Sequence, residues 1–189
     1  MVSSSGSQLL PEAAIGALRT LLIPLATLVT PNIPEAKLLL NDAGIEVRDP
    51  VDVRGMIELG NQLLHHLEPK AVLLKGGHLP LTQEGRIAQN GRDASVVVDV
   101  LLDGEKVTLI ETNFLLSRNT HGTGCSLASA ISARLALGQG LMRAVRGGVR
   151  YVETGIKTSA GLGKGNGPIN HFHSVYSLPF APYVFCLVQ

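Results

Sequence analysis

A glycine-rich turn that carries a cysteine is the part of this sequence best suited to chemistry. Residues 119–126 read Asn-Thr-His-Gly-Thr-Gly-Cys-Ser and lead into an apolar segment with helical spacing. Glycines allow a tight turn, and the free N–H groups at a helix start, with the positive end of the helix dipole, attract anions. The turn formed by Gly122, Thr123 and Gly124 therefore predicts a phosphate site with Cys125 beside it.

Cys125 and its turn have more than one interpretation. A helix start favours the thiolate form of a cysteine, so Cys125 could act as a base or a nucleophile. Equally, Gly122 and Gly124 could form only a turn, with Cys125 a small buried hydrophobe and Thr123 a helix cap. A hydrolase that pairs Cys125 with His121 is a weaker alternative, because neighbouring turn residues seldom reach triad geometry and no orienting acid is evident.

Two further segments carry polar groups that suit a phosphate or a metal ion. Asn32 and Glu35 stand three residues apart after a short apolar run, and their oxygens could hold a hydrated Mg²⁺. The same spacing matches a capping box, which is the interpretation that these residues alone favour. Lys75 follows the apolar run 71–74 and precedes two glycines, so it could meet a phosphate as a point charge or form a solvated strand end.

The elements that must position these residues alternate between helices and strands. Such alternation is typical of an α/β fold with a mostly parallel sheet, in which ligands bind at the carboxyl ends of the strands. The three candidate segments are therefore expected to converge. We expect helices over 11–22, 51–67, 123–137 and 141–159, and a further helix that follows residues 31–35 and continues through residue 40. Strands are expected over 26–30 and 71–74, with a hairpin of strands 96–102 and 106–110 around a type I′ turn at Asp103-Gly104.

Composition favours a small-molecule-binding protein in a reducing compartment. The 189 residues fit one domain, and the charged share of 16% is below the usual share of about 25%. We take the 16 basic and 15 acidic residues as spread along the chain, which predicts no nucleic-acid partner and no membrane partner. Two cysteines, Cys125 and Cys186, make no disulfide framework, and no signal peptide or membrane-length apolar run is evident. A soluble, cytoplasmic protein is expected.

Four motifs stand out along the chain. They are Thr-Pro-Asn-Ile-Pro-Glu-Ala at 30–36, Val-Leu-Leu-Lys-Gly-Gly-His at 72–78, Asn-Thr-His-Gly-Thr-Gly-Cys at 119–125 and Gly-Pro-Ile-Asn-His-Phe-His at 167–173. In order and approximate spacing, they resemble those of hydroxymethylpyrimidine/phosphomethylpyrimidine kinases of the fungal type, which are thiamine-biosynthetic members of the ribokinase-like superfamily. The resemblance covers residues 1–182, and residues 183–189 diverge. Members of the family have further strands and helices ahead of the position of Met1, so the resemblance implies a ribokinase-like domain without its N-terminal part.

The resemblance implies a role for each matching position. Residues Gly122, Thr123, Gly124 and Cys125 match the anion hole, and Cys125 stands where most ribokinase-like enzymes have an aspartate base. Asn32 and Glu35 match the element that organises Mg²⁺, and Lys75 matches a lysine that contacts the phosphates of ATP. Gly167 to His171 match a loop near the nucleotide. The implied activity is ATP-dependent phosphorylation of hydroxymethylpyrimidine or its monophosphate.

Other functions stay open beside this one. The chain could be a nucleotide-binding remnant or regulatory paralogue that catalyses nothing, and a kinase assay separates these two cases. A vitamin B6 kinase is a nearer alternative, disfavoured because its relatives usually have an acid at the position of Cys125. ATP and a small pyrimidine are the expected partners, and self-association is expected because a doubly wound sheet cut through its middle exposes a strand edge.

Overall fold

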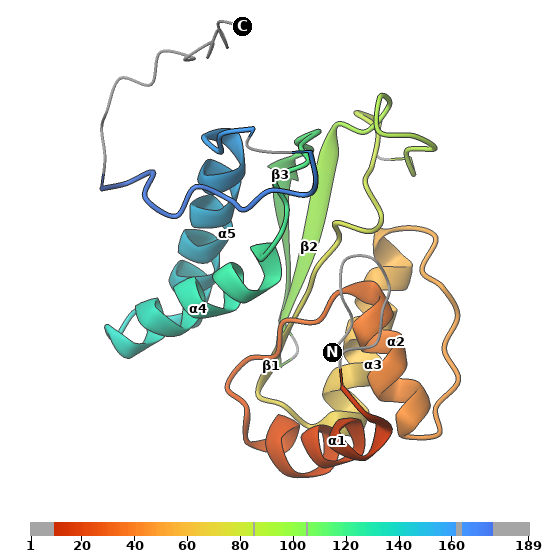
Figure 1. The fold of residues 1–189 in the computed structure, drawn as a ribbon. Coiled ribbons are helices and arrows are strands. Elements are labelled where there is room, and N and C mark those ends of the chain that lie inside the picture. Colours follow the sequence, from red (N-terminus) through yellow and green to blue (C-terminus); the bar gives the residue numbers. More distant parts are fainter. Residues whose placement is uncertain (1–9, 85, 105, 162–163, 176–189) are drawn as a thin grey trace, which may run out of the picture. The chain divides into compact units, whose positions relative to one another are not determined.

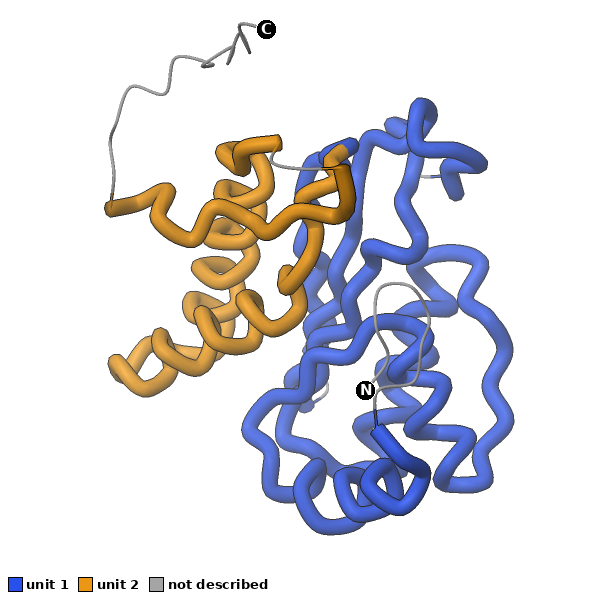
Figure 2. The backbone as a smooth tube through the Cα atoms, viewed as in Figure 1, with its two compact units in different colours: residues 1–116 blue, residues 117–189 orange. Residues whose placement is uncertain are grey.

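The computed structural model describes residues 10–84, 86–104, 106–161 and 164–175. Within them the chain divides into two compact units, residues 1–116 and residues 117–189 (Figure 2). The expected domain end at residue 182, the divergent residues 183–189 and Cys186 lie outside the described residues.

Three helical segments precede the sheet in the first unit. Helix α1 spans Glu12–Ala17 and continues as a π-helical turn, Leu18–Leu22, and a 3-10 turn, Ile23–Leu25. Helix α2 spans Ile33–Asp42, and helix α3 spans Val53–Leu67. All three lie where helical spacing predicts them, within one or two residues at most ends, because their apolar side chains recur every three or four positions.

The sheet of the first unit has three strands in the order β1-β2-β3. Strand β1 spans Ala71–Leu74, β2 spans Val96–Asp103 and β3 spans Lys106–Asn113, and both pairs of neighbours are antiparallel. Asp103 pairs with Lys106, so two residues connect the predicted hairpin, and Gly104 has a φ of 59°. That value suits a primed turn, although the second turn residue lies outside the description and the type I′ assignment stays a prediction.

Within the first unit, the described residues pair in parallel at one segment beside β1. The backbone of Ala26–Pro31 runs parallel to residues 70–75, through bonds that include Val29 N–H to Ala71 O at 3.1 Å and Leu73 N–H to Val29 O at 2.8 Å. The expected strand 26–30 therefore pairs as predicted, but the expectation of a mostly parallel sheet fails for the described strands. The reason is that a loop without a helix links β1 to β2, and such a link returns the chain antiparallel.

The core of the first unit lies between helices α2 and α3 and the sheet (Figure 1). All four residues of β1 are buried, and the alternate residues Val100 and Leu102 of β2 belong to the same core. This burial fixes the strands and so determines where their carboxyl ends place the residues that follow. The side chains that α2 and α3 contribute are Ile33, Ala36, Leu39, Leu40, Met56, Leu59, Leu63 and Leu67.

The second unit is a helical pair with a returning segment. Helix α4 spans Thr123–Ala136 and helix α5 spans Leu141–Lys157, and the two pack together (Figure 1). Gly138 ends α4 with a φ of 78°, as its position after the last apolar residue predicts. After α5 the chain comes back, because the N–H of Asn170 donates to Gly155 O at 2.9 Å and Ile169 is buried.

Candidate functional site

Asn32 and Glu35 form a complete capping box at the start of α2. The N–H of Glu35 donates to Asn32 Oδ1 at 2.8 Å, and the N–H of Asn32 donates to Glu35 Oε2 at 3.0 Å. Two amides that would otherwise lack partners are thereby satisfied, for a stabilisation of about 1 kcal/mol. The capping interpretation, favoured on the residues alone, is confirmed.

Lys75 lies beside this capping box. Its Nζ is 4.0 Å from Glu35 Oε2, with only 20% of the Lys75 side chain and 12% of the Glu35 side chain exposed. Lys75 and Asn32 are partners in a parallel β-bridge, so both stand where neighbouring parallel segments end. The expected convergence of these two segments is confirmed. It places an ammonium, a carboxylate and an amide together at the carboxyl ends of the two parallel segments.

Asp99 lies beside the same group of residues, although the sequence alone did not identify it as a candidate site residue. Its carboxylate is buried, with 9% of the residue exposed, and Oδ1 accepts a hydrogen bond of 2.8 Å from the N–H of Gly76. Burial raises the pKa of Asp99, while the Gly76 amide and the charge of Lys75 act in the opposite direction. The available signal was a single acid in the otherwise apolar run 96–102.

His78 completes the polar turn that follows β1. Packing around its ring lowers the pKa of His78, the charge of Lys75 lowers it further, and the charge of Glu35 acts in the opposite direction. The neutral imidazole is therefore favoured in the folded chain. Sequence reasoning quoted His78 within a motif but gave it no role.

Among the described residues, the turn that leads into α4 leaves two of its amides without an acceptor. Gly122 is the N-cap with a φ of 80°, a left-handed conformation that favours glycine, and no side chain caps the helix. The Thr123 hydroxyl donates to Thr120 O at 3.1 Å. In the described part of the chain, no acceptor bonds to the N–H of Gly124 or Cys125. This arrangement is what an anion site at a helix start requires.

Cys125 is exposed at this helix start, so the alternative that it is a buried hydrophobe is wrong. Among the described residues, no hydrogen bond joins Cys125 to His121, and the single acid of residues 117–189, Glu153, accepts a hydrogen bond of 2.6 Å from Lys157. A cysteine hydrolase would need both a base and an orienting acid beside the thiol. The geometry therefore gives that alternative no support.

The loop expected near the nucleotide lies beside this turn. The N–H of His121 donates to Gly167 O at 3.2 Å, and His121 and Pro168 form a parallel β-bridge. A Cβ at Gly167 would lie 2.1 Å from Asn119 Oδ1, so a larger residue at this position would require the Asn119 side chain to shift. The ring of His171, by contrast, contacts helix α5, with Tyr151 Oη 3.4 Å from its Nδ1.

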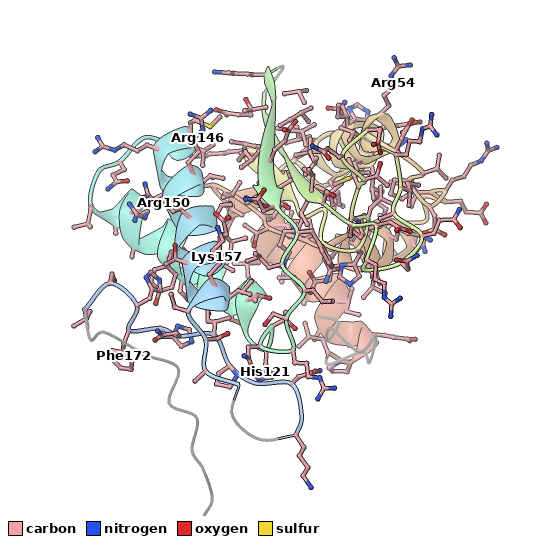
Figure 3. All side chains as sticks on the ribbon, turned by 90° about the horizontal axis from the view of Figure 1, so that it is seen from above. Arg54, His121, Arg146, Arg150, Lys157 and Phe172 are labelled. Atoms are coloured by element: carbon pink, nitrogen blue, oxygen red, sulfur yellow. The ribbon has the colours of Figure 1, made fainter. Side chains whose placement is uncertain are left out.

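Basic residues gather in the second unit. Seven of the 16 basic residues lie in residues 117–189, together with one of the 15 acidic residues. Arg146, Arg150 and Lys157 follow one another along the exposed side of α5 (Figure 3). The expectation that charges are spread along the chain is therefore wrong, and an anion near the second unit meets a net positive charge.

A family model for phosphomethylpyrimidine kinase matches residues 1–170. The chain belongs to this family. A putative hydroxymethylpyrimidine/phosphomethylpyrimidine kinase of Schizosaccharomyces pombe is 38% identical over 183 residues, which cover 96% of this chain and 33% of that protein. The hydroxymethylpyrimidine/phosphomethylpyrimidine kinase of Synechococcus elongatus is 36% identical over 93% of this chain and 60% of its own length.

Solved structures confirm the ribokinase-like α/β class for this phosphomethylpyrimidine kinase family member. An ADP complex of Bacillus subtilis pyridoxal kinase matches with a TM-score of 0.71 and 30% identity, over 92% of this chain and 58% of that one. Pyridoxal kinase of Staphylococcus aureus with AMP-PCP matches with a TM-score of 0.69 and 25% identity, over 88% and 54%. The chain thus spans between one third and three fifths of the length of these proteins.

The oxygen atoms at the start of α2 fit the hydrated Mg²⁺ that the family implies. The capping box places the amide oxygen of Asn32 and the carboxylate of Glu35 side by side at this helix start. Mg²⁺ in proteins keeps several waters and takes one or two carboxylates, so this donor set suits it.

Among the described helices, none is both long enough and apolar enough to cross a membrane.

Proposed function

We propose that this chain takes part in ATP-dependent phosphorylation of hydroxymethylpyrimidine or its monophosphate in thiamine biosynthesis. The observation that carries the proposal is the start of α4, where Gly122 turns the chain and the amides of Gly124 and Cys125 have no acceptor among the described residues. Phosphoryl transfer depends chiefly on positioning and on electrostatic stabilisation, which preorganised amides supply. Membership of the phosphomethylpyrimidine kinase family supports the choice of substrate.

Each candidate residue then has a role in binding or in moving a proton. The amides of Gly124 and Cys125 bind negative charge that develops on the transferred phosphoryl group, and the ammonium of Lys75 holds an ATP phosphate. Asn32 and Glu35 hold Mg²⁺ through its water shell, and the bound ion neutralises phosphate charge. The exposed thiol of Cys125 orients the acceptor hydroxyl and takes up its proton.

The residues Gly167 to His171 form the side of the nucleotide site that faces the turn. The backbone bridge between His121 and Pro168 holds this segment against the residues that precede α4. A loop fixed in this way excludes water from the phosphates without contributing a charge of its own. We also expect a reducing compartment such as the cytoplasm, because Cys125 is exposed and unpaired.

Binding of MgATP by the chain tests this proposal. Gly124→Asp places a carboxylate at the start of α4, and we expect it to abolish binding measured by calorimetry. Gly140→Asp is the matched control, because it adds the same charge at the N-cap of α5, where a Cβ meets no atom within 4 Å. Equal affinity of wild type and Gly124→Asp would exclude the turn as the phosphate site.

A kinase assay with three acceptors separates the remaining functions. Transfer to hydroxymethylpyrimidine or its monophosphate is the expected result. Transfer to pyridoxal alone would favour a vitamin B6 kinase, a candidate supported by the 30% identity to a pyridoxal kinase structure. MgATP binding without transfer to any acceptor would identify a nucleotide-binding or regulatory paralogue.

A further inference from the structure

The hydrogen-bond ladder between β1 and β2 ends on a side chain. Leu74 is the last residue of β1 in register, opposite Val100, so Lys75 follows it beside Asp99. The N–H of Lys75 turns the other way and donates to Pro31 O at 2.9 Å. The next amide, of Gly76, donates to Asp99 Oδ1 at 2.8 Å. A buried carboxylate thus determines where the chain goes after the strand.

The path at Gly76 is narrow on its other side as well. A Cβ at Gly76 would lie 1.9 Å from Val98 O and 2.8 Å from Val98 C, closer than real Cβ contacts. The backbone of Gly76 is therefore held between the Val98 carbonyl and the Asp99 carboxylate. Lys75 precedes this fixed residue directly, so the direction of its side chain follows from the same two contacts.

Stability alone does not account for an acid at this position. Transfer of a carboxylate from water to a site with 9% exposure is costly, and apolar residues of similar size usually stabilise such sites as well or better. The neighbours of Asp99 in β2, Val98 and Val100, are themselves apolar. What the carboxylate adds is a charge-assisted hydrogen bond to one amide and a negative charge near one ammonium, that of Lys75.

We propose that Asp99 is a positioning residue, which holds the Lys75–Gly76 turn so that the Lys75 ammonium meets an ATP phosphate. This inference rests on the proposed function for the phosphate partner, and on the described geometry for the turn itself. Asp99 acts through Gly76 and Lys75 and touches no substrate. Without its acceptor, the Gly76 amide loses its partner and the turn is free to shift, which takes Lys75 away from Glu35.

The test compares two substitutions of Asp99 with one control. Asp99→Asn keeps an acceptor for the Gly76 amide, whereas Asp99→Leu removes it and keeps the branched shape of the side chain. Asp103→Leu makes the same change at the exposed end of the same strand. Calorimetry should show that Asp99→Leu lowers the affinity for MgATP by about tenfold or more relative to wild type. For Asp99→Asn and Asp103→Leu, the affinity should stay within about threefold of wild type. Tenfold loss in Asp99→Asn as well would overturn the role of the hydrogen bond.

Two measurements that need no nucleotide accompany the binding data. Exchange of the Gly76 amide hydrogen and acetylation of Lys75 by acetic anhydride should both be faster in Asp99→Leu than in wild type and in Asp99→Asn. Unchanged rates in a folded Asp99→Leu would overturn the proposal. If wild type binds no MgATP, the proposed function fails for this chain, and these two rates alone decide whether Asp99 positions the turn.

A second substitution of Asp99 tests the proposal if Asp99→Leu does not fold. If Asp99→Leu shows no cooperative thermal transition, Asp99→Thr takes its place, because a β-branched residue suits a strand and its short hydroxyl does not reach the Gly76 amide. The same faster exchange and weaker binding are expected. A folded Asp99→Thr with wild-type amide exchange, Lys75 acetylation and MgATP affinity would overturn the assignment.

Discussion

Gly76 and Gly77 are neighbours that differ in the space around them. A Cβ at Gly76 would collide with the Val98 carbonyl, whereas a Cβ at Gly77 would meet nothing within 4 Å. We therefore expect Gly76→Ala to lower the free energy of unfolding by about 1–3 kcal/mol, as in overpacked sites. Gly77→Ala should change it by less than about 1 kcal/mol. Urea unfolding of both variants measures the difference, and equal values would show that the backbone at Gly76 relaxes freely.

Cys125 is expected to act in the transition state rather than in nucleotide binding. Cys125→Ala should lower kcat by about 10²–10⁴-fold, the usual effect of removing a general base, and leave the KM for ATP almost unchanged. Steady-state kinetics with hydroxymethylpyrimidine as acceptor provide the measurement. Ser126→Ala is a suitable comparison, because the Ser126 hydroxyl donates to Gly122 O within the same turn. An unchanged kcat would show that the thiol takes no part.

The sequence identified those site residues that have a recognisable turn or strand end next to them in the chain. Asn32, Glu35 and Lys75 stand next to glycine, proline or a strand end, and the structure brings all three together. Asp99 was missed because apolar residues surround it in the sequence, and only the strand register shows that it faces the Gly76 amide. A side chain whose partner lies 23 positions away leaves no local pattern.

The turn after β1 links two shifted titrations with opposite signs. Burial raises the pKa of Asp99 above its ordinary value of 3.8, so the protonated carboxyl stabilises the folded chain relative to the unfolded one. This stabilisation is complete below pH 3.8 and is lost as the pH rises through the folded pKa. Packing and the charge of Lys75 lower the pKa of His78 below 6.5, so the neutral imidazole stabilises the folded chain. This stabilisation is complete above pH 6.5 and is lost as the pH falls through the folded pKa.

Unfolding free energies between pH 3 and pH 8 test both titrations. Asp99→Asn should remove the loss of stability that accompanies a rising pH, and His78→Gln should remove the loss that accompanies a falling pH below 6.5. His65→Gln on helix α3 serves as the reference for the second variant. Curves parallel to wild type for both variants would mean that the turn has no influence on acid stability.

Among the elements, the helices were predictable and the direction of β2 was not. Helices α2 to α5 carry apolar residues at helical spacing and clear end signals, such as Asn32 before α2 and Gly138 after α4. The strands and the β2–β3 hairpin were recognised too, yet the expectation of a mostly parallel sheet did not include the antiparallel pairing of β2 with β1. Residues 75–95 show no periodicity, so nothing local indicated that the chain returns antiparallel.

The whole molecule has an open sheet edge bordered by exposed leucines. No described residue hydrogen-bonds to the backbone of Leu28 or Thr30, which face away from β1. Nearby, Leu21, Leu22 and Leu25 are 70%, 59% and 76% exposed. Unpaired edges and exposed apolar side chains promote association between copies. We therefore expect the chain to self-associate in size-exclusion chromatography with light scattering.

A charge at the leucines should reduce this association. Leu22→Lys with Leu25→Lys adds repulsion beside the edge, whereas Leu137→Lys changes an equally exposed leucine, 80% accessible, at the end of α4. The double variant should shift the molar mass towards the monomer, and the control should behave as wild type. A monodisperse wild-type monomer would show that the edge recruits no second copy.

The pairing of Val29 with Val72 also has a consequence for the order in which the chain folds. About 40 residues separate the two partners, so they meet only after a long loop has closed, and ribosomal synthesis must first extend well past residue 72. Helices α4 and α5 are consecutive and contact each other locally, which favours rapid folding. During synthesis the segment 26–31 therefore spends seconds without its strand partner, and this interval is when a chaperone has access to it.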